Sequence, residues 1–207
     1  MNNSNWNTRF ETINTIVSLV TNHKEAVLRS SKLVHIVDIL CKGCLDNNLK
    51  VVIHSLGSLM KVLPLIGLGI DLHLNLIVTT LAGALSSGNA SVRNLARDVF
   101  DCLSENTDHN SLIVPLTQAT ASTNIRAKPV LIAIIDELST KMYATKSTAV
   151  HKYVVPLAYR LMDDTKVEIR NSIQKLLSML HDHMGSLLVE MAPSNKVQKV
   201  MDVLKNK

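Results

Sequence analysis

The sequence predicts an all-α fold, an α-solenoid in which helical hairpins stack one behind another. Three observations predict it. Apolar residues make up 46% of the 207 residues but aromatic residues only 3%, so the core must be built from aliphatic side chains. Seven Gly and five Pro are few for a protein with many tight turns. Apolar residues follow the helical period, and one turn pattern returns along the chain.

Helical periodicity is clear in four segments. In each of them apolar residues fall at i, i+3, i+4 and i+7, which places them on one face of a helix. The segments are 13–20, 33–40, 92–103 and 169–180. None of them shows the sustained strict alternation of a half-buried strand, so we expect helices.

A turn followed by a helix start recurs four times, at 46–51, 87–93, 122–126 and 163–168. Each turn has a polar residue that can cap a helix and then a β-branched residue that we expect in the core. The capping residues are Asn48, Asn89, Asn124 and Asp164. Aligned on Val51, Val92, Ile125 and Val167, the turns are 41, 33 and 42 residues apart. This is the period of two-helix HEAT or armadillo units, so we predict five to six HEAT-type hairpins.

The chain contains no linker rich in Pro, Ser or Gly, so the sequence predicts a single domain over 1–207. Helix pairs are expected at 5–45, 49–86, 90–121, 124–162 and 166–192, with a last helix over 194–205. Pro115, Pro129 and Pro156 should lie in first turns or at kinks, because a proline inside a helix removes a backbone hydrogen bond.

Composition argues against several classes of protein. The net charge of +5 is scattered, without the clustered basic and aromatic residues of a nucleic-acid binder, and indicates a mild preference for an acidic partner. Three cysteines and an N-terminus without an apolar stretch favour a reducing, cytosolic setting. Segment 62–90 carries one charge, Asp71, but is interrupted by polar residues and turn formers, so we expect a buried repeat helix and not a membrane span.

No catalytic or metal-binding motif is present. The sequence has no phosphate-binding glycine loop, no G-x-S-x-G and no H-E-x-x-H. Cys41 and Cys44 have the C-x-x-C spacing but no second ligand pair. His181 and His183 are two residues apart, so they do not share a helix face. The sequence therefore predicts neither an enzyme nor a bound cofactor or metal.

The start of the chain, Asn5-Trp6-Asn7-Thr8-Arg9-Phe10-Glu11, resembles the opening of a TOG domain, where a Trp in the first turn precedes an Arg and a helix. The four later turns resemble the second to fifth TOG turns in order, and the likeness spans the whole chain. Among TOG proteins the chain is most similar to the crescerin and CLASP groups, which act on ciliary or cytoplasmic microtubules. The resemblance implies a flat, paddle-like solenoid whose intra-repeat turns contact tubulin.

The resemblance also implies which residues would bind tubulin. Trp6 would pack on tubulin, basic residues would supply positive charge, and asparagines would form hydrogen bonds. The implied set is Trp6, Asn48, Lys50, Asn89, Arg93, Asn124, Arg126, Lys166 and Arg170. Cations suit the acidic surface of tubulin, and an aromatic anchor supplies affinity. The fifth turn departs from this pattern, because Glu168 stands at the position that Arg93 and Arg126 occupy in their turns.

The residues themselves leave alternatives open. Trp6 could simply pack on the first helix pair, and the basic residues could be solvated helix starts. The implied partner is αβ-tubulin or microtubules, with no nucleic acid and no membrane, for a domain that is monomeric alone and belongs to a multi-domain chain. Cytoplasm, cytoskeleton and the cilium or axoneme are the implied locations. The alternative function is a generic HEAT or armadillo adaptor that holds a peptide or protein on its helical surface without binding tubulin.

Overall fold

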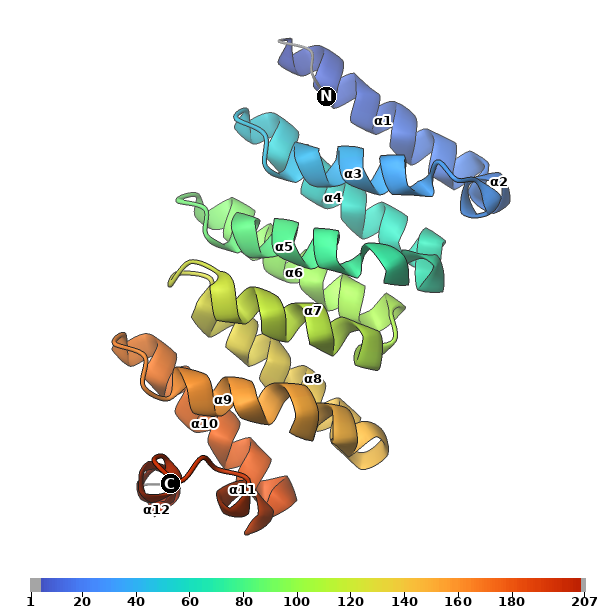
Figure 1. The fold of residues 1–207 in the computed structure, drawn as a ribbon. Coiled ribbons are helices and arrows are strands. Elements are labelled where there is room, and N and C mark those ends of the chain that lie inside the picture. The colour runs from blue at the N-terminus through green and yellow to red at the C-terminus, as the bar shows by residue number, and fades with distance from the viewer. Residues whose placement is uncertain (1–4, 206–207) are drawn as a thin grey trace. The chain divides into compact units, whose positions relative to one another are not determined.

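A computed structural model describes residues 5–205 of the chain, and every regular element in that range is a helix (Figure 1). Cα packing divides the chain into two compact units, Met1–Pro115 and Leu116–Lys207. Helix α7 (His109–Ser122) spans the division. The all-α fold of stacked helical hairpins is confirmed, whereas the single domain over 1–207 stays a prediction.

The first unit consists of helices packed in successive pairs. Its elements are α1 (Trp6–Asn22), α2 (Lys24–Arg29), α3 (Leu33–Cys44), α4 (Leu49–Ile66), the 3₁₀ helix η1 (Gly67–His73), α5 (Leu74–Leu85) and α6 (Ala90–Asn106). Helix α4 packs against both α1 and α6, while α3 packs on α4 and α5 on α6 (Figure 1). Short turns join α3 to α4 and α5 to α6.

The second unit repeats this plan with one irregular helix. Its elements are α8 (Lys128–Ala149), the π-helix η2 (Val150–Val154), α9 (Val155–Leu161), α10 (Val167–Met184), α11 (Leu187–Glu190) and α12 (Val197–Lys205). Helix α10 packs on α8 and α9. The chain kinks at Lys146 (φ −139°, ψ 39°) before the π-helix. Helix α12 is fixed by the buried Val200 and by Lys196 and Lys199, both paired with Asp163.

The core is aliphatic, as the composition predicts. Ile13, Ile16 and Val20 of α1 are buried, and so are the periodic residues of α3, α6 and α10. Phe100 is among the largest fully buried side chains. The burial of such apolar surface stabilises the fold by about 25 cal/mol for each Å², and it is the main force that holds helices of this kind together.

The helices differ from the predicted pairs in detail. The short helix α2 precedes α3, and the second helix of the last pair is reduced to the four residues of α11. Pro129 and Pro156 lie in the first turns of α8 and α9, as predicted. Pro115 lies inside α7 and not in its first turn, so a kink at this proline stays a prediction.

The apolar segment Leu49–Leu85 is long and apolar enough to cross a membrane by composition alone. The structure folds it into α4, η1 and α5, and half of its most apolar window is buried inside the fold. Core helices of water-soluble proteins commonly meet the same criterion, so the segment is weak evidence for a membrane span.

Candidate functional site

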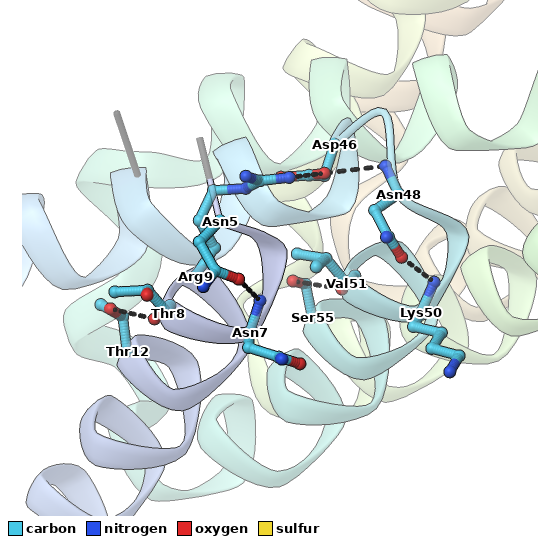
Figure 2. Close-up of polar contacts among 10 residues, drawn as sticks. All are labelled: Asn5, Asn7, Thr8, Arg9, Thr12, Asp46, Asn48, Lys50, Val51 and Ser55. Atoms are coloured by element: carbon cyan, nitrogen blue, oxygen red, sulfur yellow. Dashed lines mark hydrogen bonds and ion pairs between the residues drawn. The ribbon is translucent and has the colours of Figure 1, made fainter. Parts of the chain in front are cut away.

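In the first unit, asparagines cap the three helices that begin at one common edge. The Oδ1 atom of Asn5 accepts a hydrogen bond from the backbone N–H of Asn7 at 3.0 Å, and that of Asn48 accepts from Lys50 at 2.9 Å (Figure 2). Asn89 accepts from Ser91 at 2.9 Å and also from Val92 at 3.3 Å. Such bonds satisfy N–H groups that have no partner within the helix. The caps at Asn48 and Asn89 are confirmed, and sequence reasoning missed the one at Asn5.

In the second unit, the corresponding residues hold the turns without acting as caps. Asn124 accepts a hydrogen bond from the backbone N–H of Arg126 at 3.0 Å, but α8 begins only at Lys128. The Oδ1 atom of Asp164 accepts from the N–H of Lys166 at 3.0 Å, and Lys166 is itself the residue that precedes α10. The prediction that Asn124 and Asp164 cap their helices was therefore wrong by two or three positions.

The register of the repeat also needs correction. Val51 and Val92 are buried as predicted, but Ile125 and Val167 are 51% and 59% exposed. The core positions are filled two residues later, by Ala127 and Ile169, which are completely buried. The third residue after Asn48 is Val51 and the third after Asn89 is Val92, and both enter the core. Ala127 and Ile169 stand at the same position after Asn124 and Lys166. The β-branched character of Ile125 and Val167 led to the wrong alignment.

The corrected register places a basic residue four positions after most of these turn asparagines. The residues at this position are Arg9, Val52, Arg93, Lys128 and Arg170. Arg170 is therefore the counterpart of Arg93, and the comparison of Glu168 with Arg93 was wrong. Nη1 of Arg93 donates to the backbone carbonyls of Ser87 and Gly88 at 2.8 and 3.0 Å. Nη1 of Arg170 donates in the same way to Asp164 and Thr165 at 2.8 and 2.9 Å.

The other two basic residues at this position join consecutive turns within their own unit. In the first unit the guanidinium of Arg9 makes two hydrogen bonds of 2.7 Å to the carboxylate of Asp46 in the next turn (Figure 2). These side chains are only 12% and 8% exposed. The hydrogen bond from Arg9 holds the pKa of Asp46 below its ordinary value. In the second unit Nζ of Lys128 lies 3.5 Å from the carboxylate of Asp164.

Trp6, the first residue of α1, lies half-buried at the turn edge of the first unit. Its indole meets the ring of Phe10 edge-on, with ring centroids 6.4 Å apart and planes at 88°. Nζ of Lys50 lies 5.0 Å from the indole centroid, within the range of a cation–π contact. Trp6 thus packs on its own helix and also keeps part of its surface open beside a cation.

Sequence reasoning missed a second feature of the turns, an exposed apolar side chain next to an exposed cation. Leu49, the first residue of α4, is 46% exposed and precedes Lys50. The exposed Ile125 precedes Arg126, and the exposed Val167 follows Lys166. The signal in the sequence was the apolar residue that directly follows each turn asparagine, or Lys166 in the last turn. Trp6 occupies the same position after Asn5.

The cysteines and histidines that were considered for chemistry pack against other parts of the fold. Cys41 and Cys44 are buried free thiols, and burial raises the pKa of Cys41 to about 11, so it stays protonated. The ring of His183 stacks on Tyr143, with centroids 4.5 Å apart. Across residues 5–205, no three His, Cys, Asp or Glu side chains come together in a way that could hold a metal ion.

Known proteins share sequence and fold with this chain. No protein-family model matches the chain. The mouse and human proteins named TOG array regulator of axonemal microtubules protein 1 are 24% and 23% identical to it over 204 residues, which cover 94% of the chain. These residues are 11% and 12% of the two relatives, so the chain spans about a tenth of their length.

Solved TOG structures share the fold at low sequence identity. A crescerin TOG domain superposes with a TM-score of 0.76 at 15% identity, covering 96% of this chain and 83% of that one. The MAST/Orbit N-terminal domain gives 0.71 at 15% identity over 99% and 93%. A TOG domain of C. elegans Zyg9 gives 0.75 at 16% identity over 99% and 78%. The chain therefore has the helical-repeat TOG fold.

Proposed function

We propose that this domain binds αβ-tubulin through the turns that begin α1, α4, α8 and α10, as one module of a longer microtubule regulator. The function is recognition without chemistry. The relatives that the chain matches are named as regulators of axonemal microtubules, and they are about nine times as long as the chain. On this proposal the parent protein acts at ciliary or axonemal microtubules and contains further domains.

One observation carries the proposal, the exposed apolar residue beside an exposed cation in the turns of both units. Each of these apolar side chains keeps about half of its surface exposed, and a cation near the start of a helix opposes the helix dipole by about 0.3–1 kcal/mol. An acidic partner that covers the turn buries the rest of the apolar side chain and adds opposite charge beside the cation.

The contacts support different roles for the predicted residues, and the proposal adds Leu49, Ile125 and Val167 to them. Trp6, Leu49, Ile125 and Val167 are the proposed apolar anchors, and Lys50, Arg126 and Lys166 are the proposed cations that face tubulin. The guanidinium groups of Arg93 and Arg170 each hold two backbone carbonyls, so these residues shape the turns and add positive potential. Asn48, Asn89 and Asn124 likewise use their Oδ1 atoms within the turns.

Binding of the purified chain to αβ-tubulin, by gel filtration and by co-sedimentation with microtubules, tests this proposal. We expect a complex that weakens between low and moderate salt, because exposed charges are screened within about 10 Å at 0.1 M ionic strength. Trp6→Ala and Arg126→Ala, one in each unit, should each weaken it with helical content unchanged. A wild-type chain that binds neither tubulin nor microtubules at low salt would contradict the proposal and favour the adaptor function.

A further inference from the structure

Behind Trp6 lies a second layer of rings that the tubulin-binding set does not include. Phe10 and the indole meet in an edge-to-face arrangement, and the imidazole of His54 stacks flat on Phe10, with centroids 3.8 Å apart and planes at 16°. We call Lys50, Trp6, Phe10 and His54 the aromatic column.

The column follows from the spacing of its members on two packed helices. Trp6 and Phe10 are four residues apart on α1, and Lys50 and His54 are four residues apart on α4. Residues at i and i+4 lie one above the other on a helix face. Since α1 packs against α4, Trp6 meets Lys50 at the edge, and Phe10 meets His54 one turn deeper.

His54 is an unusual choice for a purely structural position. Its Nε2 atom is buried and has no hydrogen-bond partner, which costs stability that a leucine would not. Burial, with repulsion from Lys61, lowers the pKa of His54, and Glu11 opposes the shift. The lowered pKa favours the uncharged form of the imidazole that lies flat against Phe10.

We propose that Phe10 and His54 are positioning residues, which hold the indole of Trp6 in the orientation in which it meets tubulin. The inference rests on the proposed function of Trp6. An indole that is already fixed loses less rotamer freedom on binding, which is worth roughly 0.5–1.5 kcal/mol per side chain and corresponds to roughly a 2- to 12-fold change in affinity.

Trp6 is the only tryptophan of the chain, so its fluorescence reports on the column without a label. The test compares Phe10→Leu with Phe100→Leu. The chain has just these two phenylalanines, and Phe100 is a buried residue of α6 in the same unit. Both changes remove a ring from the first unit, but only Phe10→Leu breaks the column. His54→Ala and His54→Phe form a second pair, in which phenylalanine restores a flat ring.

For Phe10→Leu and His54→Ala we expect faster loss of Trp6 fluorescence anisotropy, stronger quenching by iodide and weaker tubulin binding, by roughly 2- to 12-fold. Phe100→Leu and His54→Phe should leave all three close to wild type while circular dichroism shows the chain folded. Unchanged Trp6 anisotropy in Phe10→Leu would overturn the inference. A variant in which the indole moves more freely but the affinity for tubulin stays at the wild-type value would overturn it as well. If the wild type does not bind tubulin, the proposed function fails, and the fluorescence still shows whether the column holds Trp6.

Discussion

At the scale of the residue, most polar side chains near the turns hold the turns themselves. Asp46, Ser87 and Asp164 each accept the backbone N–H two residues further on, at 2.8, 3.2 and 3.0 Å. The guanidinium of Arg93 or Arg170 satisfies two carbonyls of the turn that precedes its helix. A turn held from both sides keeps a fixed shape, and the exposed side chains that it carries are then presented in a defined orientation.

The pair of Arg9 and Asp46 gives a prediction at this scale. Asp46→Asn should lower the free energy of unfolding, because it leaves Arg9 without its paired carboxylate in a nearly buried position. Urea unfolding at neutral pH measures this change. Asp38→Asn is the matched control, since Asp38 pairs with Lys42 on the exposed surface of α3, where ion pairs contribute little.

The same pair has a predicted pH dependence. The pKa of Asp46 is lower in the folded chain than in the unfolded one, so its stabilisation is complete above the ordinary value of 3.8 and is lost as the pH falls through the folded value. The difference between wild type and Asp46→Asn should therefore narrow as the pH is lowered below 3.8. An equal loss of stability in Asp46→Asn and Asp38→Asn at neutral pH would contradict a special role for the pair.

At the scale of the element, the sequence predicted the helices well and their register less well. The aliphatic 3.6-residue period placed α1, α3, α6 and α10, because each helix must bury one face. The start of a helix depends on how many residues the turn before it uses. The turn at Asn124 uses three more residues before α8 begins at Lys128, and nothing in the local composition marks that difference. The exposed position of Ile125 could therefore not be predicted.

The corrected register predicts that two substitutions at the start of α10 affect different properties, one the stability of the chain and the other its binding to tubulin. Ile169→Ala should destabilise the chain by about 2–5 kcal/mol, because it leaves a cavity at a fully buried position. Val167→Ala should change stability by no more than about 0.5 kcal/mol but weaken tubulin binding, because Val167 is exposed in the turn. Thermal unfolding of both variants checks the register. A larger loss of stability from Val167→Ala than from Ile169→Ala would restore the original alignment.

At the scale of the molecule, composition and repeat period predicted the all-α fold of hairpins, and the resemblance suggested the proposed function. The candidate site could be predicted only in part. Trp6, Lys50, Arg126 and Lys166 were named through the resemblance, and their contact with tubulin stays a prediction. The aromatic column could not be, because Phe10 and His54 are 44 positions apart and meet only when α1 packs on α4.

The whole chain carries a net charge of only +5, so general attraction to an acidic surface is weak. Recognition then depends on where the cations lie, and the turns place them beside apolar anchors in each unit. In a parent protein with several such domains, modest affinity at each one would be multiplied by linkage along the chain.

The most direct test of the account is the affinity for αβ-tubulin of two charge reversals in the first unit, Lys50→Glu and Lys24→Glu. Both lysines are exposed, but Lys50 lies at the turn beside Trp6, whereas Lys24 begins α2, beyond the opposite end of α1. The net charge changes equally, so any general electrostatic effect is the same in both. The account predicts that Lys50→Glu weakens binding by about tenfold or more, the effect of about 1.4 kcal/mol, while Lys24→Glu binds nearly as wild type. Equal losses in the two variants would show that tubulin is not recognised through the turns.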